Sequence, residues 1–135
     1  MNGFLLDTNV ISEVVKPRPN PAVVAWLEGR ESIVLCAITI EELTYGIERA
    51  KGKARESLRE WFDDLLEAEP RIVPISAEVA ATAGRLRAQR EAVGRRVAQA
   101  DMLVAAAALT EGLVLATRNV ADFERCGLAL FNPFA

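Results

Sequence analysis

The segment LLDTNVIS (residues 5–12) places one carboxylate, Asp7, directly after a short apolar run, with the polar residues Thr8 and Asn9 behind it. The run GFLLD (residues 3–7) has the length and apolar character of a buried strand. A carboxylate at the end of a strand can serve as an Asx-turn residue, or it can belong to a functional site. Because ligands gather at the carboxyl ends of parallel strands, other acids at other strand ends would favour a site.

Apolar runs of strand length recur along the chain and alternate with helical patterns. Strands are predicted at residues 3–7, 32–38, 71–75 and 113–117, with a short fifth at 128–133. Helices are predicted from the cap Asn20 to Gly29, from Thr39 to near Gly52, over 54–69, from Ser76 to an interruption near Gly94, and over 97–112. Because proline has no main-chain N–H to donate, Pro74 predicts that the third strand lies at an edge of the sheet or that the strand ends there. The alternation predicts a single α/β domain over residues 1–135, doubly wound, with a mainly parallel sheet of four to five strands flanked by helices.

Composition excludes several classes of protein and of chemistry. The chain of 135 residues has no histidine, which rules out Ser-His dyads and histidine-ligated zinc. No apolar run approaches the roughly 20 residues of a membrane span, and no basic stretch precedes an apolar one at the start. We therefore expect a cytoplasmic protein without membrane contact. Cys36 and Cys126 lie far apart without CxxC spacing, which predicts two buried, reduced thiols.

Four acids stand where a doubly wound fold gathers the ends of its strands: Asp7, Glu42, Asp101 and Asp122. Each also has a purely structural interpretation. Thr39 and Glu42 fit a capping box, and Asp122 fits a turn. Asp101 enters an apolar helix, where a partly buried carboxylate needs hydrogen bonds or a cation such as Arg96 or Arg118.

Taken together, the four acids favour a metal site. Clustered carboxylates repel one another unless a positive charge separates them. Mg²⁺ prefers oxygen ligands and keeps several waters, so two or three carboxylates are enough to bind it. Such an ion can activate water for the hydrolysis of a phosphodiester and neutralise charge on the phosphate.

An arginine-rich stretch follows within an otherwise acidic chain of net charge −3. Five arginines oppose the single acid Glu91 between positions 85 and 96, and they are Arg85, Arg87, Arg90, Arg95 and Arg96. The stretch is either a weak RNA-binding face that contacts phosphates or an ordinary solvated helix face. Some of these arginines could also serve a contact with a second copy or a protein partner.

Four segments in order resemble the signature motifs of PIN-domain ribonucleases, and more narrowly of the VapC/FitB-type toxins of toxin–antitoxin pairs. They are LLDTNVIS (5–12), TIEELTYG (39–46), QADMLVAAAAL (99–109) and LATRNVADF (115–123), and they span nearly the whole chain. The resemblance implies an endoribonuclease dependent on Mg²⁺ or Mn²⁺, with Asp7, Glu42 and Asp101 as metal ligands and Asp122 as a fourth catalytic acid. Thr8, Asn9, Thr117 and Asn119 would support these acids.

One position departs from the family pattern. Members often carry aspartate two residues after the threonine at position 117, where this chain has Asn119, so either Asn119 or Asp122 completes the acidic set. The resemblance also implies a homodimer, an RNA substrate and a cognate antitoxin that inhibits the toxin and binds DNA.

Other doubly wound proteins fit the sequence less well. A phosphoacceptor receiver domain needs a lysine near its last strand, and the lysines of this chain are Lys16, Lys51 and Lys53. A haloacid-dehalogenase phosphatase needs Asp-x-Asp at the first strand, where position 9 is Asn9. The alternative is a non-catalytic PIN-fold module that binds RNA or a protein partner. The intact acids disfavour this alternative.

Overall fold

The computed structural model describes residues 3–135 and contains a five-stranded parallel sheet in the order β3-β2-β1-β4-β5. The strands are β1 (Phe4–Leu6), β2 (Val34–Cys36), β3 (Arg71–Val73), β4 (Val114–Ala116) and β5 (Leu130–Phe131). The chain runs outward from β1 to β3 on one side of the sheet and returns to β4 and β5 on the other. The predicted doubly wound fold is confirmed, and β3, which ends just before Pro74, lies at an edge.

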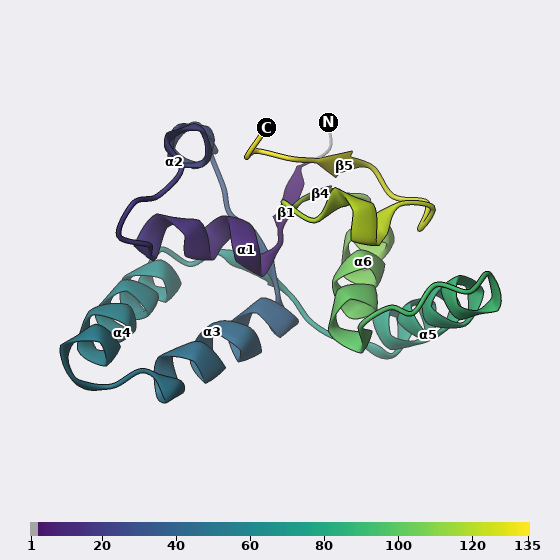
Figure 1. Cartoon of the computed structure of the whole chain (residues 1–135), viewed down its shortest axis with the longest axis horizontal. Coiled ribbons are helices and arrows are strands. Elements are labelled where there is room, and N and C mark those ends of the chain that lie inside the picture. The colour runs from purple at the N-terminus through teal and green to yellow at the C-terminus, as the bar shows by residue number, and fades with distance from the viewer. Residues whose placement is uncertain (1–2) are drawn as a thin grey trace.

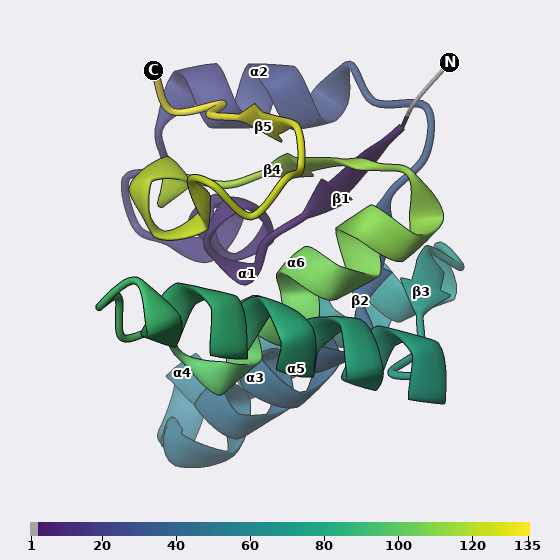
Figure 2. The ribbon, with the colours of Figure 1, turned by 90° about the vertical axis from the view of Figure 1, so that its right-hand side faces the viewer.

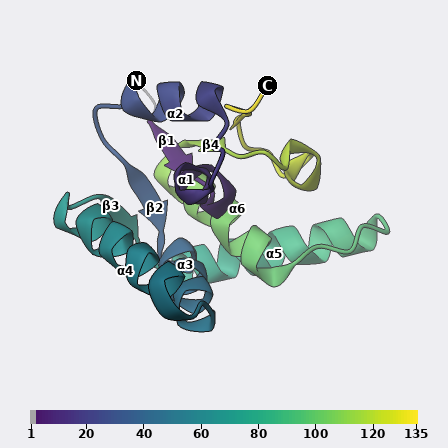
Figure 3. The same ribbon diagram turned by 60° about the vertical axis from the view of Figure 1, so that its left-hand side comes forward.

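Helices cover both faces of the sheet (Figures 1 and 2). They are α1 (Thr8–Ile11), α2 (Pro21–Glu28), α3 (Ala37–Arg49), α4 (Gly52–Glu67), α5 (Ala77–Ala92) and α6 (Gln99–Glu111), with 3₁₀ turns at Ser12–Val15 and Val120–Phe123. Helices α5 and α6 pack on one face, and α1 to α4 pack on the other. Figure 3 shows α3 and α4 side by side, and the two helices are in contact.

The alternation of side chains along each strand divides the apolar interior into two cores. Leu5 and Leu115 face α5 and α6, whereas Leu6 and Leu35 face the opposite layer. Four consecutive alanines of α6, from Ala105 to Ala108, have no exposed surface. Small side chains let this helix lie close against the sheet, and its first turn is thereby held at the carboxyl ends of the strands.

The predicted helix ends are partly confirmed. Asn20 caps α2 through hydrogen bonds from the main-chain N–H groups of Ala22 and Val23, and Gly112 ends α6 with a left-handed backbone at φ 65°. Helix α3 begins at Ala37, so the prediction that Thr39 opens this helix was wrong, and the alternative interpretation of Thr39 and Glu42 as a capping box does not hold. Within residues 3–135, no helix is long and apolar enough to cross a membrane.

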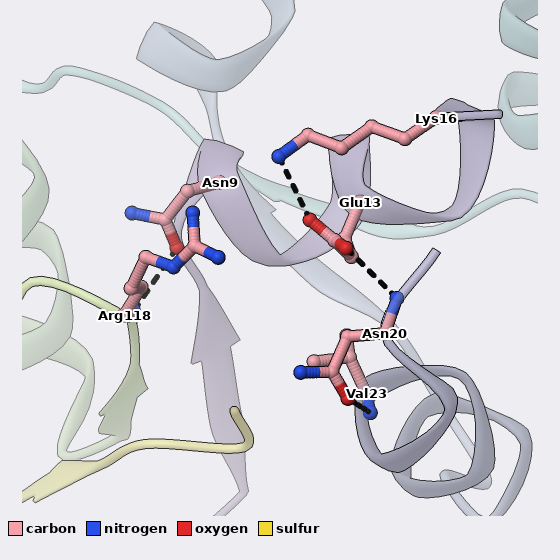
Figure 4. A network of polar contacts seen from close by, with 6 residues as sticks. All are labelled: Asn9, Glu13, Lys16, Asn20, Val23 and Arg118. Carbon is pink, nitrogen blue, oxygen red and sulfur yellow. Dashed lines mark hydrogen bonds and ion pairs between the residues drawn. The ribbon is translucent and has the colours of Figure 1, made fainter. Parts of the chain in front are cut away.

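A buried acid, Glu13, fixes the turn between α1 and α2 (Figure 4). Its Oε2 accepts a hydrogen bond of 2.8 Å from the main-chain N–H of Asn20, and its Oε1 lies 3.0 Å from Nζ of Lys16. The donor at Asn20 and the ammonium of Lys16 lower the pKa of Glu13. These bonds join the segment behind Asp7 to the cap of α2.

Candidate active site

Asp7 stands between β1 and α1 at the point where the strand order reverses. Its Oδ1 accepts a hydrogen bond of 2.8 Å from the main-chain N–H of Thr8, which makes Asp7 the N-cap of α1. Its Oδ2 accepts a bond of 2.9 Å from Thr117 Oγ1 and one of 3.4 Å from Asn9 Nδ2. Burial raises the pKa of Asp7 against the effect of these donors, and the charge of Glu42 adds to the rise.

Thr117 links the end of β4 to the end of β1. Its side chain is fully buried, and its Oγ1 also accepts hydrogen bonds from Asn119 N–H at 3.0 Å and from Asn9 Nδ2 at 3.3 Å. Asn9 Oδ1 in turn accepts a bond of 3.1 Å from the main-chain N–H of Arg118, which is drawn in Figure 4. Both predicted supporting residues therefore contact Asp7, Thr117 from the end of the neighbouring strand β4 and Asn9 from α1.

Glu42 reaches the same region from the second turn of α3. Its Oε1 accepts a hydrogen bond of 2.6 Å from Thr8 Oγ1, which also lies 2.9 Å from Thr39 Oγ1. Glu42 is exposed to solvent, whereas Thr39 is fully buried. The main-chain N–H of Thr8 binds Asp7 and its hydroxyl binds Glu42, so this one residue joins two of the predicted acids.

Asp101 lies in the first turn of α6 and is half-buried. Burial raises its pKa to about 6, and the charges of Asp7, Asp122 and Glu42 contribute in that order. None of the ion pairs formed within residues 3–135 includes Asp101, so the predicted alternative partners Arg96 and Arg118 do not neutralise it. The structure therefore brings four acids from four different segments within electrostatic range of one another.

A small cavity of about 110 Å³ opens beside Asp101. Its lining includes Asp122 and the two arginines of the loop between α5 and α6, Arg95 and Arg96. Asp122 belongs to the 3₁₀ turn after β4. Asn119 precedes that turn, and its main-chain N–H binds Thr117. Of these two candidates for the fourth position, Asp122 is the one that shares a cavity with Asp101.

The donor set fits a hard divalent ion that keeps part of its hydration shell. All four side chains offer carboxylate oxygens, and the charges of the other three add to the rise in the pKa of Asp101. Within residues 3–135, no three acidic or thiol side chains converge closely enough to hold a metal ion alone. An ion at this site would therefore take one or two carboxylate ligands from these acids, with waters and a substrate phosphate completing its coordination, which is the usual arrangement for Mg²⁺.

The arginine-rich stretch does not form one continuous surface. Arg85, Arg87, Arg95 and Arg96 are exposed, but Arg90 is only 5% exposed. Burial raises the pKa of the Cys126 thiol, and the charge of Arg90 offsets part of this rise. The inclusion of Arg90 among the surface arginines was wrong. Arg87 pairs with Glu91 at 3.4 Å, whereas Arg95 and Arg96 line the cavity that holds Asp101 and Asp122.

The sequence did not identify two buried polar residues near this site. The sequence pattern places Thr39 at a helix cap and gives no signal for Glu13. The spacing 79, 83, 86 and 90 in α5 could have located Arg90, because it continues the buried stripe of Val79, Ala83 and Leu86.

Both cysteines are buried free thiols, as predicted, and burial raises the pKa of Cys36 beside Asp7 and Glu42.

Comparison with known proteins identifies the family. The model of the PIN domain matches residues 4–127. The chain is 38% identical to toxin FitB of Neisseria gonorrhoeae over 97% of its length and 98% of that protein. It is 35% identical to a VapC ribonuclease of Sinorhizobium fredii over 97% of each chain.

The fold gives the same result. The solved structure of FitAB bound to a DNA fragment contains a chain that is 36% identical, with a TM-score of 0.90 over 98% of this chain and 96% of that one. Such agreement covers the sheet and the helices on both of its faces. The protein belongs to the PIN-domain family, among the VapC/FitB-type toxins of toxin–antitoxin systems.

Proposed function

We propose that this protein is a Mg²⁺- or Mn²⁺-dependent endoribonuclease, the toxin of a toxin–antitoxin pair that acts in the cytoplasm. The observation that carries the proposal is Asp101. It is a half-buried carboxylate whose pKa is raised to about 6 by burial and by three other acids. Such an arrangement is costly in an ion-free protein and becomes favourable when a hard cation binds.

Each residue of the site would have a distinct task. Asp7, Asp101 and Glu42 would hold the ion, and Asp122 would serve as a further acid at the edge of the cavity. When bound, the ion supplies an activated water and neutralises charge on the scissile phosphate. Arg95 and Arg96 would bind the phosphates of the RNA on either side, since guanidinium groups suit phosphate oxygens.

The partner is inferred from the relatives. FitAB was solved as a complex on DNA, and this chain is 36% identical to a chain of that complex. We therefore infer an antitoxin that inhibits the toxin and binds DNA, and a homodimer of the toxin within the assembly. A non-catalytic module would also bind such a partner, but it would have no use for four carboxylates within electrostatic range of one another.

Cleavage tests the proposal. The purified protein, freed of any co-expressed antitoxin, is incubated with pooled bacterial RNA in Mn²⁺, in Mg²⁺ and in EDTA. We expect discrete products with either ion and none after chelation, with activity restored by added Mn²⁺. Cleavage at full rate in EDTA would exclude the metal mechanism, and RNA binding without cleavage in any buffer would favour the non-catalytic module.

A further inference from the structure

A chain of three oxygen atoms leads from the protein interior to Glu42. Thr8 Oγ1 lies 2.6 Å from Glu42 Oε1 and 2.9 Å from Thr39 Oγ1. Thr39 has no exposed surface, and Glu42 faces solvent. A buried hydroxyl is costly unless it is hydrogen-bonded, and within residues 3–135 the side chain of Thr39 has Thr8 as its partner.

The number of protons fixes the direction of this chain. A threonine hydroxyl has one proton to donate, and an ionised carboxylate can only accept. Thr8 therefore donates to Glu42, and the short separation of 2.6 Å is typical of a bond to a charged acceptor. Since the proton of Thr8 is then in use, Thr39 must donate to Thr8. Donors in such a series strengthen one another.

Thr39 has no other evident task. Helix α3 begins two residues earlier, at Ala37, and its cap Cys36 makes no side-chain capping bond. Valine has nearly the same shape and would fill this buried position without a polar group. The bond to Thr8 explains why this position carries a hydroxyl. The bond also selects one side-chain rotamer, since threonine in a helix otherwise divides between two.

We propose that Thr39 is a positioning residue of the active site. It holds the hydroxyl of Thr8 in one rotamer, and Thr8 in turn holds the carboxylate of Glu42 beside the acids Asp7 and Asp101. This inference rests on the proposed function, since it assigns Thr39 to the same metal site. Outer groups of this kind orient metal ligands without touching the metal.

The test compares Thr39→Val and Thr39→Ser with a matched control on the same helix. Thr44 is exposed, and its Oγ1 donates a bond of 2.7 Å to the main-chain oxygen of Ile40, so Thr44→Val removes a hydroxyl that has no link to the site. For each variant, Mn²⁺ affinity is measured by titration with detection of free ion by electron paramagnetic resonance. The kcat and KM for a short RNA are measured separately, and a thermal melt in EDTA gives the folded fraction.

We expect Thr39→Val to weaken Mn²⁺ binding and lower kcat by roughly 10-fold to 100-fold, with KM for RNA little changed. Thr39→Ser restores the hydroxyl and should return both values close to wild type, whereas Thr44→Val should match wild type throughout. In a Glu42→Gln background, Thr39→Val should cause no further loss, because its effect passes through Glu42. If Thr39→Val does not fold, Thr8→Val removes the middle link and should reproduce the same losses.

The two proposals fail in different ways. A wild-type protein that neither binds Mn²⁺ nor cuts RNA would contradict the proposed function itself. A wild-type protein that does both, beside a folded Thr39→Val variant with equal affinity and kcat, would overturn only the role of Thr39. The role of Thr39 would also be overturned if the losses in Mn²⁺ affinity and kcat caused by Thr39→Val added fully to those caused by Glu42→Gln. Thr39 would then act independently of that carboxylate.

Discussion

Asp101 is subject to opposing electrostatic effects. It lies in the first turn of α6, where the helix dipole favours a negative charge. Burial and the charges of Asp7, Asp122 and Glu42 act against ionisation, and they raise its pKa from 3.8 to about 6. Burial and repulsion together therefore exceed the effect of the helix end. The consequence is that the ion-free protein carries a strain that neutralising this single side chain should relieve.

Replacing Asp101 with asparagine keeps the shape of the side chain and removes its charge. A carboxyl whose pKa is raised in the folded state stabilises the fold below its ordinary pKa, and this contribution is lost as the pH rises through the folded value. In EDTA, the melting temperature of Asp101→Asn relative to wild type should therefore rise between about pH 4 and pH 6 and then level off. The same variant should lose Mn²⁺ binding and RNA cleavage. Melts at half-unit pH intervals check the first expectation.

An exposed acid supplies the control for this experiment. Asp64 on α4 faces solvent, so Asp64→Asn should show no comparable rise through pH 6. If Asp101 were the partner of a buried cation, its replacement would instead destabilise the protein at neutral pH by several kcal/mol. That result, together with normal cleavage per folded molecule, would remove Asp101 from the site.

At the scale of elements, the sequence predicted the order of strands and helices because apolar periodicity marks them directly. It did not predict that residues 8–15 are helical, since Thr8, Asn9 and Ser12 are weak helix formers and are typical of a turn. Tertiary contacts decide this segment. Val10 and Ile11 are buried in the core, and Asp7 caps the helix from the strand before it.

Two errors concerning helices α3 and α5 have a common cause. The sequence pattern predicts a cap at Thr39 and a surface position at Arg90, because polar side chains are usually found at those places. Both are buried, and each lies on the inner side of its helix. The acids were easier to find, since their positions follow from the ends of strands and helices. Which hydroxyl or amide supports each acid depends on contacts between segments as distant as Asp7 and Thr117.

The loop between α5 and α6 should carry the contact with RNA phosphates. Arg95 and Arg96 line the cavity with Asp101 and Asp122, whereas Arg85 and Arg87 lie further back on α5. Replacing both loop arginines with alanine should weaken RNA binding and reduce the slope of log affinity against log salt by about 1.4, or roughly 0.7 for each phosphate that is no longer neutralised. Binding isotherms at several salt concentrations measure this slope.

The double replacement of Arg85 and Arg87 by alanine is the matched control, because it removes the same charge from the same stretch. Its slope should stay close to that of the wild type. Equal slopes for both double variants and the wild type would return the whole stretch to an ordinary solvated surface. A change of oligomeric state on sizing would instead assign the arginines to a protein contact.

For the whole molecule, the proposed metal site predicts a link between ion binding and global stability. A ligand that binds only the folded state stabilises it by about 2.7 kcal/mol at a concentration 100 times its dissociation constant. For a domain of this size, that corresponds to a rise in melting temperature of roughly 8 °C. Saturating Mn²⁺ should therefore raise the Tm of the wild-type protein by this order, as measured by a thermal melt against EDTA.

Asp7→Asn should abolish that rise without unfolding the protein, since asparagine caps a helix as well as aspartate does. Asp64→Asn serves again as the control and should keep the full rise. A gain in Tm that survives Asp7→Asn would mean that Mn²⁺ stabilises the protein from another place.

The large sequence separation between Thr117 and Asp7 bears on the stage of synthesis at which the protein could become active. The two residues are 110 positions apart, and Asp101 also lies late in the chain. A polypeptide that has left the ribosome only as far as position 100 contains Asp7 and Glu42 but neither of their later companions. Strand β1 then still lacks β4, its neighbour on one side. On the proposed assignment of the site, the nascent chain would therefore have no nuclease activity during synthesis of the first hundred residues. An inhibitor would be needed only when the last quarter of the chain emerges.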